Sequence, residues 1–332
     1  MILVTGATGH IGNVLVRELI AKGESVRALV MPSDDERPIA DLPVDIAWGN
    51  VLVPITLERA LEGIDTVYHL AGLVSIAPGQ EELLESVNVG GTRNVIEACM
   101  KMGVRRLVYC SSIHAIVEPP PGIPIDESCG FDPSKSRGDY DRSKARASLE
   151  VLNAVEQGLD AVIVCPTGVI GPYDYLDSIM GQVIRDLASN SMKVLPAKGG
   201  YDFVDVRDVA AGLILAAEKG RTGEAYILSG NYIDINSLGA LVDELCGQKP
   251  VRRPRVPMWL VQACANCSDF FCNMTGRKSR LTRYSIETLL SNANISSAKA
   301  RQELGYSPRP LRESIADTLK WMAESDRLGT TA

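Results

Sequence analysis

The sequence predicts an α/β protein built on a doubly wound parallel β-sheet, and three observations support this fold class. Short runs rich in β-branched residues alternate with amphipathic helical patterns over the first two-thirds of the chain. Several of these runs are almost continuously apolar, which is typical of parallel strands covered by helices on both faces. A glycine-rich loop, TGATGHIG, follows the first run directly and precedes a helical pattern.

Seven runs are expected to form the strands of this sheet. They are MILVT (1–5), SVRALV (25–30), VDIAW (44–48), DTVYHL (65–70), RLVYCS (106–111), AVIVCP (161–166) and EAYILS (224–229). Helical patterns such as HIGNVLVRELIAKG and VGGTRNVIEACMKMG lie between them, and a glycine ends each of these two patterns. The regular succession of strand and helix predicts βαβ units.

The strand–helix alternation stops after Pro166. Residues 172–200 and about 231–332 contain helical and irregular segments without a strand repeat. We therefore expect a main domain made of residues 1–171 and about 201–230. The remainder, residues 172–200 and about 231–332, is expected to form a smaller, mostly helical lobe.

Composition and charge argue against several classes of protein. The 332-residue chain has a net charge of −7, whereas nucleic acid binding needs a basic face. No stretch is long and apolar enough to span a bilayer. The glycine loop begins after only five residues, too early for the apolar region of a signal peptide. These features predict a cytoplasmic protein that neither binds nucleic acid nor spans a membrane.

The eight cysteines occur at irregular positions, which predicts reduced thiols and no disulfide framework. The one cluster is Cys264, Cys267 and Cys272. The histidines of the chain are His10, His69 and His114. All three histidines lie far from the cysteine cluster in sequence, so a complete ligand set for zinc is not apparent. We expect these cysteines to pack in a core or line a pocket, and we expect no metal site.

The glycine loop has the spacing of a dinucleotide-binding loop. Gly6 permits a tight turn, Gly9 lets the backbone approach a pyrophosphate, and Gly12 allows the helix to pack close to the sheet. The phosphates are expected at the positive end of the helix that follows. A strand before the loop and a helix after it predict a Rossmann-type domain.

The end of the second strand bears on which dinucleotide binds. An NAD site places a carboxylate there to bind the ribose 2′-hydroxyl, but the strand ends Val30-Met31-Pro32. Asp34 and Asp35 come several residues later, and Ser33 and Arg37 are the nearest candidates for binding a 2′-phosphate. The missing carboxylate slightly favours NADP(H) over NAD(H).

Tyr140 and Lys144 stand four residues apart in the segment YDRSK. On a helix these positions share one face, so the phenol and the ammonium would point the same way. One interpretation is a surface helix turn with a charge pair from Asp141 and Arg142. The other is an acid/base tyrosine whose pKa, normally about 10, is lowered by a fixed positive neighbour.

Several motifs together resemble those of extended short-chain dehydrogenases/reductases. In order along the chain they are TGATGHIG, DTVYHLAG (65–72), NVGGT (88–92), YCSS (109–112) and YDRSK (140–144). The later segments CPTGVIGP (165–172), YDFVDVRDVA (201–210) and ISSAKARQELGYSPRP (295–310) also resemble landmarks of that superfamily. The resemblance covers nearly the whole chain and is greatest to the dihydroflavonol-reductase and 3β-hydroxysteroid-dehydrogenase group.

The resemblance implies a catalytic set of Ser112, Tyr140 and Lys144. Tyr140 matches the acid/base, and Lys144 matches the residue that binds the nicotinamide ribose and lowers the tyrosine pKa. Ser112 matches the hydroxyl that orients the substrate oxygen, with Ser111 as the alternative if the alignment shifts by one position. Hydride would pass between nicotinamide and a carbonyl carbon while Tyr140 exchanges the proton.

The loop and the resemblance together imply a set of cofactor contacts. These are Gly6, Thr8, Gly9, His10, Ile11, Gly12, Met31, Asn50, Val51, Ala71, Gly72, Tyr140, Lys144, Pro166 and Thr167. Asn88 matches the asparagine of an N-x-x-G-T stretch and is expected to be structural. Asp208 is expected to cap a helix. His114 is either a substrate contact or a structural histidine, and the sequence leaves both readings open.

The expected substrate is a small hydrophobic ketone, aldehyde or secondary alcohol. The segments expected to close over the pocket are apolar, namely Tyr173, Tyr175, Leu176, Ile179, Met180 and residues 256–274. Nucleotide-sugar epimerases of the superfamily typically carry a GDG-x-x-R stretch, but PAKGGYDFVDV lacks the arginine. A nucleotide-sugar epimerase or dehydratase with bound NAD is the alternative function, followed by a dinucleotide-sensing regulator. By analogy with the superfamily we expect a homodimer, paired through helices around 91–102 and 141–157.

Overall fold

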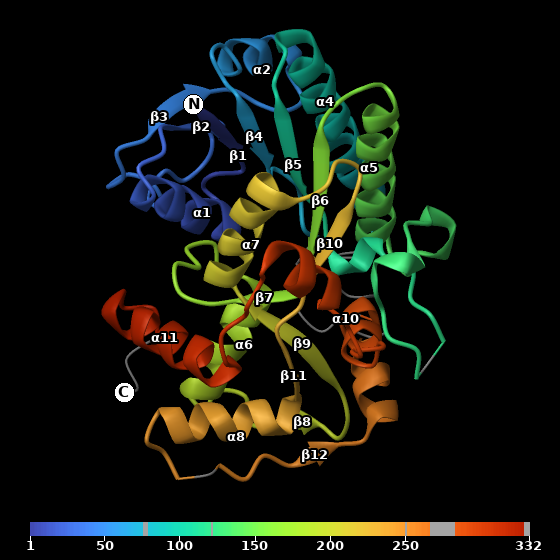
Figure 1. Cartoon of the computed structure of the whole chain (residues 1–332). Coiled ribbons are helices and arrows are strands. Elements are labelled where there is room, and N and C mark those ends of the chain that lie inside the picture. Colours follow the sequence, from blue (N-terminus) through green and yellow to red (C-terminus); the bar gives the residue numbers. More distant parts are fainter. Residues whose placement is uncertain (76–78, 121, 250, 266–282, 329–332) are drawn as a thin grey trace.

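The structure is a computed structural model that describes residues 1–75, 79–120, 122–249, 251–265 and 283–328. Figure 1 shows two lobes, with a large sheet and its helices in one and a smaller assembly of helices and short strands in the other. Among the described residues, no helix combines the length and apolar character needed to cross a membrane.

All seven expected strands form one parallel sheet. They are β1 (Ile2–Thr5), β2 (Val26–Val30), β3 (Asp45–Trp48), β4 (Thr66–His69), β5 (Arg106–Cys110), β6 (Ala161–Pro166) and β10 (Ala225–Leu228). Their order is β10-β6-β5-β4-β1-β2-β3. β2 and β3 therefore lie on one side of β1, and the strands from β4 onward lie on its other side. This arrangement is the doubly wound Rossmann sheet, and the predicted fold class is confirmed.

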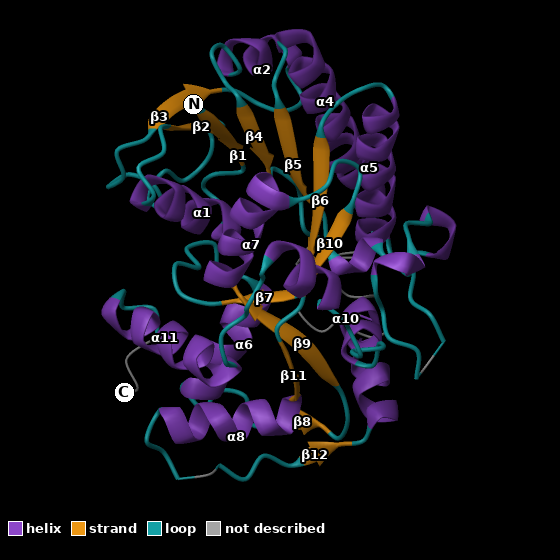
Figure 2. Cartoon of the chain, in the orientation of Figure 1, coloured by secondary structure: helices purple, strands orange, loops and turns teal. Residues whose placement is uncertain are grey.

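Helices cover both faces of this sheet (Figure 2). One face packs against α1 (His10–Ala21) and α7 (Val206–Lys219). The other packs against α2 (Pro54–Ala60), α4 (Gly91–Met102) and α5 (Asp139–Glu156). Neighbouring strand residues such as Leu107 and Val108 point to opposite faces, and both are fully buried. This burial on both faces explains why the strand sequences are continuously apolar.

The smaller lobe contains more strand than the sequence suggested, and two of its strands, over 168–170 and 200–205, come almost entirely from ranges expected in the main domain (Figure 1). A three-stranded sheet combines β7 (Gly168–Ile170), β9 (Gly200–Asp205) and β11 (Asn231–Asp234), and β8 (Leu195–Pro196) pairs with β12 (Arg255–Val256). These strands have two to six residues, too few for a clear period-two pattern. The helices of this lobe whose two ends are described are α6 (Ile179–Ala188), α8 (Ile235–Leu245), α10 (Arg283–Leu289) and α11 (Leu311–Glu324), and residues 258–265 are also helical.

Short helical turns complete the described part of the chain. They are α3 (Glu81–Leu84), the π-helical turns Glu85–Gly90 and Ala300–Leu304, and the 3-10 turns Ile113–Ala115, Glu127–Cys129 and Pro133–Lys135. Four of them lie against α5, and of these Glu85–Gly90 and Ile113–Ala115 border the site described next.

Candidate active site

The glycine loop lies where β1 ends, beside the end of β4. Gly6 has a positive φ of 69°, and a Cβ there would come within 2.7 Å of the backbone nitrogen of Ala71. A Cβ on Gly12 would collide with the Gly6 carbonyl. Gly9 caps α1, whose first backbone N–H groups have no partner inside the helix. The loop therefore has the close backbone packing and the helix terminus that suit a pyrophosphate.

The carboxylate of Asp34 lies at the end of β2, although Asp34 comes four residues after Val30. The Met31 backbone N–H donates to Asp34 Oδ2 at 3.2 Å, and Thr8 Oγ1 lies 3.4 Å from the same oxygen. The loop after β2 thus turns back on itself and brings a carboxylate beside the glycine loop. Arg37, by contrast, forms an ion pair with Asp35 and is largely exposed.

The other expected cofactor residues follow the same edge of the sheet. Asn50 and Val51 come directly after β3, and Asn94 of α4 donates to the Val51 carbonyl at 2.9 Å. Pro166 ends β6, and the Thr167 hydroxyl donates to Asp202 at 2.7 Å. Parallel strands end at one edge, so the predicted contacts share that edge.

Two expected cofactor side chains are engaged elsewhere in the protein. The His10 ring nitrogen Nε2 lies 3.0 Å from the Pro172 carbonyl oxygen, and the Thr167 hydroxyl is bound to Asp202. The side chains of His10 and Thr167 therefore already have partners within the protein.

Ser111 and Ser112 end up in different surroundings. Ser111 Oγ lies 2.7 Å from Ser148 Oγ in a fully buried contact with α5. Ser112 caps the 3-10 turn that follows β5, and its Oγ accepts a hydrogen bond from the His114 backbone N–H at 3.2 Å. Because this contact occupies a lone pair, the Ser112 hydroxyl proton stays available to another acceptor. Of the two serines, Ser112 therefore has the geometry of a site residue.

Lys144 is buried one helical turn after Tyr140 on α5. Its Nζ donates to the Cys110 carbonyl at 2.8 Å and to the Tyr109 hydroxyl at 3.2 Å. A Cβ on Gly72 would lie 3.8 Å from this nitrogen. The ammonium is thus fixed between the ends of β4 and β5, beside the backbone stretch that the sequence placed at the cofactor.

The pKa of Tyr140 is raised in the protein. Burial raises it, and the Lys144 ammonium and the Ser112 hydroxyl lower it only in part. The lysine therefore acts in the predicted direction, but desolvation of the phenolate outweighs it. The expectation of a lowered pKa does not hold for the protein without cofactor, where Tyr140 is a protonated phenol at neutral pH.

Asn88 connects the segment after β4 to the helix that carries Tyr140. Its side chain accepts from the Leu73 backbone N–H at 2.7 Å and donates to the Ser143 hydroxyl at 2.9 Å. Ser143 in turn donates to the Tyr140 carbonyl at 2.8 Å. The side chain is 2% exposed, so it has the structural position that the sequence suggested.

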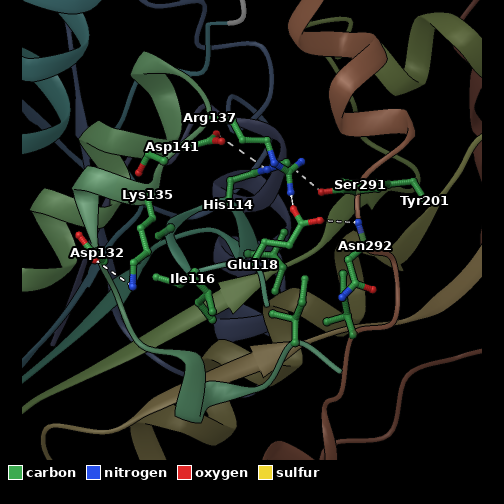
Figure 3. A pocket seen from close by; sticks show the side chains of 16 residues that line it. His114, Ile116, Glu118, Asp132, Lys135, Arg137, Asp141, Tyr201, Ser291 and Asn292 are labelled. Carbon is green, nitrogen blue, oxygen red and sulfur yellow. Dashed lines mark hydrogen bonds and ion pairs between the residues drawn. The ribbon is translucent and has the colours of Figure 1, made fainter. Parts of the chain in front are cut away.

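Three side chains that the sequence analysis did not select surround His114. Tyr201 Oη lies 2.8 Å from His114 Nε2, and Asp141 Oδ1 lies 3.8 Å from His114 Nδ1. The Tyr284 hydroxyl donates to the same Asp141 oxygen, and its ring covers Gly138 at the start of α5. Figure 3 shows the Tyr201 hydroxyl directed at the imidazole.

The two residues that follow Tyr140 differ in burial: Asp141 lies inside the protein and Arg142 lies at its surface. Asp141 is 3% exposed, whereas Arg142 forms ion pairs with Glu81 and Asp139 at the surface. The proposed surface pair of Asp141 with Arg142 is therefore wrong, because consecutive helix positions face different directions.

His114, Asp141 and Tyr201 line one part of a crevice (Figure 3). Its apolar wall is made of Ile113, Ile116, Ile125 and Ile295. Four of its charged groups form two pairs, Glu118 with Arg137 and Asp132 with Lys135, and Asp141 also lines it. The crevice therefore combines aliphatic surface with two ion pairs and one buried carboxyl.

The apolar residues expected over the pocket lie mostly against the core of the smaller lobe. Tyr173, Tyr175 and Met180 pack against the core of the smaller lobe, and Leu176 is exposed. Asn13 of α1 donates to the Tyr173 carbonyl at 3.1 Å, so this segment lies beside the helix of the glycine loop.

The structure describes only some of the residues on which the expectation of no metal site was based. Within the described ranges, no group of three or more histidine, cysteine or acidic side chains is arranged to hold a metal ion. Cys264 is exposed, and Cys267 and Cys272 lie outside the described residues, as does the end of the 256–274 segment.

These features suit a dinucleotide-binding protein of the Rossmann type, and comparison with known proteins gives the family. Residues 2–229 match the NAD dependent epimerase/dehydratase family. The chain belongs to this family, whose members include the extended short-chain dehydrogenases/reductases that the motifs resemble.

Individual relatives match over almost their whole length. The chain is 37% identical to sterol demethylase protein B of Methylococcus capsulatus, covering 97% of this chain and 98% of the relative. It is 34% identical to a putative dihydroflavonol 4-reductase of Synechocystis, covering 96% and 93%. Among solved structures, gox2253 superimposes with a TM-score of 0.86 at 36% identity, covering 98% and 99%.

Proposed function

We propose that this protein is an NAD(P)-dependent oxidoreductase that interconverts a hydrophobic ketone or aldehyde and its alcohol, with Tyr140 as the acid/base. The observation that carries the proposal is the meeting of Ser112, Tyr140 and Lys144 at the edge of the sheet where β4 and β5 end, beside Gly72. The reduced nicotinamide supplies hydride, and the protein supplies the proton and fixes the carbonyl oxygen.

Each side chain has a distinct part in this reaction. Ser112 donates its hydroxyl proton to the substrate oxygen, because its contact with the His114 backbone N–H uses one of its two lone pairs and leaves that proton free. Tyr140 is protonated at neutral pH and gives its proton to the developing alkoxide. Lys144 favours the phenolate that results, because its ammonium is fixed by the Cys110 carbonyl.

The chain has residues that suit each part of a dinucleotide. The glycine loop and the first turn of α1 would bind the pyrophosphate, and Ala71, Gly72 and Lys144 would lie along the nicotinamide ribose. Asp34 would accept a hydrogen bond from the ribose 2′-hydroxyl, and the same carboxylate would repel a 2′-phosphate. The position of Asp34 therefore supports NAD(H), against the slight preference for NADP(H) that the strand sequence suggested.

A hydrophobic substrate is supported by the crevice and by the named relatives. Aliphatic side chains line one wall of the crevice, and four of its five acidic and basic side chains form ion pairs, Asp141 being the fifth. The relatives are named for a sterol demethylase component and a dihydroflavonol reductase. Both names refer to substrates with fused or linked rings, and we infer a similarly apolar ring compound here.

The expected homodimer would pair α4 and α5 of two copies. Met100 and Met102 at the end of α4 are exposed apolar side chains, which such pairing would cover. Sedimentation equilibrium of the purified chain tests this expectation, and a monomer at micromolar concentration would contradict it.

A cofactor titration followed by a substrate panel tests the proposed function. Calorimetry with NADH and NADPH measures binding, and absorbance at the nicotinamide band measures turnover of ketones, aldehydes and nucleotide sugars. Tyr140→Phe is expected to bind cofactor like the wild type and to lose at least about 100-fold in turnover. Tyr232→Phe, at an exposed tyrosine of β11, is the matched control.

The same panel separates the alternatives. Turnover of nucleotide sugars alone, with NAD retained through purification, would indicate an epimerase or dehydratase. Cofactor binding without turnover of any compound would indicate a dinucleotide-sensing regulator.

A further inference from the structure

His114 is the meeting point of four side chains from three parts of the chain. Its ring lies 6.3 Å from the ring of Tyr140, 5.9 Å from that of Tyr201 and 6.1 Å from that of Tyr284, centroid to centroid. Asp141 faces the remaining ring nitrogen. Tyr201 belongs to β9 and Tyr284 to α10, so the smaller lobe contributes both of these phenols to the wall beside Tyr140.

The charges around His114 decide which of its nitrogens carries the proton. Burial and the nearby Arg137 lower the pKa of His114 to about 4, so the imidazole is neutral at neutral pH. Burial raises the pKa of Asp141 to about 6, which leaves this carboxyl mostly ionised above neutral pH. A carboxylate 3.8 Å from Nδ1 attracts the ring proton to that nitrogen. Nε2 is then a hydrogen-bond acceptor.

The tautomer of His114 fixes the direction of the hydrogen bond to Tyr201. With Nε2 as the acceptor, the Tyr201 hydroxyl must donate across the 2.8 Å contact. Tyr201 remains protonated, because burial and the negative charge of Asp141 both raise its pKa. Its only proton is then directed at the imidazole, and the lone pairs of its oxygen remain as acceptors.

Building on the proposed function, we propose that Asp141 and His114 orient Tyr201 as a hydrogen-bond acceptor for the substrate. The enzyme would then select carbonyl compounds that carry a hydroxyl group, or another hydrogen-bond donor, close to the reacting carbon. Tyr201 is the substrate contact, and Asp141 and His114 are positioning residues.

The two sides of the site then differ in their polarity. Ser112 and Tyr140 both offer protons and so bind the carbonyl oxygen, while Tyr201 offers only lone pairs. A substrate with a carbonyl on one carbon and a hydroxyl nearby satisfies both sides. A compound that lacks the hydroxyl leaves the buried acceptor without a partner, which costs affinity.

Matched ketones test this preference. Benzoin carries a hydroxyl beside its carbonyl, deoxybenzoin lacks it, and benzoin methyl ether keeps the oxygen but loses the donor; 2-hydroxycyclohexanone and cyclohexanone form a second, smaller pair. We expect the wild type to prefer the hydroxyl compounds by about tenfold in kcat/KM. Tyr201→Phe is expected to abolish the preference by raising KM for the hydroxyl compounds, while Tyr232→Phe should leave it intact.

The outcomes distinguish this inference from the function on which it rests. Turnover of none of these or other carbonyl compounds would contradict the proposed function itself. Turnover with equal kcat/KM for hydroxyl, methoxy and deoxy compounds would leave the oxidoreductase in place and overturn the role of Tyr201.

A second measurement reads the tautomer without any substrate. The chain has three histidines, so nitrogen-15 NMR of histidine-labelled protein is simple to assign, with His114→Gln identifying the signal of His114. We expect a neutral ring with the proton on Nδ1 in the wild type, and a change in this signal in Asp141→Asn. A proton on Nε2 in the wild type would overturn the inference.

Discussion

The hydroxyl oxygens of Ser111 and Ser148 lie 2.7 Å apart inside the protein, and this contact separates the roles of two adjacent serines. Ser148 also donates to the Lys144 carbonyl one turn earlier on α5 at 2.8 Å. Ser111 thus joins the end of β5 to the helix that carries Tyr140. Ser112, the next residue, points its hydroxyl toward Tyr140 instead.

This difference predicts opposite results for two alanine variants. Ser112→Ala should lower kcat by about 100-fold with little change in stability, because one donor to the substrate oxygen is lost. Ser111→Ala should lower the free energy of unfolding by about 1 kcal/mol and leave most of the activity, because only a buried hydrogen bond is lost. Steady-state kinetics and urea unfolding of both variants make the comparison. The reverse pattern would assign the catalytic hydroxyl to Ser111.

Replacing Lys144 by methionine should move the pH profile of alcohol oxidation. In the proposed reaction, oxidation requires the phenolate of Tyr140, and the Lys144 ammonium lowers the pKa of that phenol. Without the ammonium the pKa rises further, so the rising limb of kcat/KM against pH moves to higher pH and the rate near neutral pH falls by at least about tenfold.

A surface lysine provides the control for this experiment. Lys320→Met removes an ammonium that is largely exposed and lies 4.0 Å from Glu324, and its pH profile should match the wild type. If Lys144→Met loses activity without any movement of the limb, the lysine acts only by binding the cofactor.

The main sheet could be predicted from the sequence because its strands are buried on both faces. Leu107 and Val108 are both fully buried, and such runs are apolar without interruption. The short strands of the smaller lobe carry no comparable pattern. In β11, for example, Tyr232 is 58% exposed, so neither alternation nor a continuous apolar run marks the strand.

In the site, too, contacts between residues close in sequence could be predicted, whereas contacts between distant residues could not. Tyr140 and Lys144 are separated by one helical turn, so their spacing alone predicts a common face. Tyr201 reaches His114 from 87 residues away, and Tyr284 reaches Asp141 from 143 residues away. No local pattern indicates such contacts, because they depend on how the smaller lobe packs on the larger one.

Asp34 is expected to determine the choice between the two dinucleotides. Its carboxylate lies beside Thr8 and the Met31 backbone, where a ribose 2′-hydroxyl would donate to it and a 2′-phosphate would be repelled. Asp34→Asn keeps an acceptor for the Met31 N–H and removes the charge. Calorimetry should show the affinity ratio of NADPH to NADH rising by at least about tenfold in this variant.

The neighbouring acid is the matched control for Asp34. Asp35 is paired with Arg37, so Asp35→Asn leaves the Asp34 carboxylate in place and should not reverse a preference for NADH. Wild-type protein that binds NADPH more tightly than NADH would contradict the role of Asp34 and support the original interpretation of the strand sequence.

Asp141 should make the protein less stable as the pH rises through about 6. Burial raises the pKa of Asp141 to about 6 from an ordinary value of 3.8, so the folded state favours the neutral carboxyl. The stability from this group is fully present below about pH 4 and is lost as the pH rises through the folded pKa. At about pH 8 the loss is on the order of 3 kcal/mol, since one pKa unit corresponds to about 1.4 kcal/mol.

Asp141→Asn removes this titration and allows the loss to be measured. Relative to the wild type, the variant should gain on the order of 3 kcal/mol in its free energy of unfolding between about pH 4 and pH 8. Urea unfolding at both pH values gives this difference, and Asp139→Asn, at a less buried acid of the same helix, should give none of comparable size. An Asp141→Asn variant whose pH dependence equals that of the wild type would mean that the carboxyl ionises at an ordinary pKa. The charge of Asp141 would then be stabilised within the folded protein, most directly by Arg137 and by the Tyr284 hydroxyl that it already accepts.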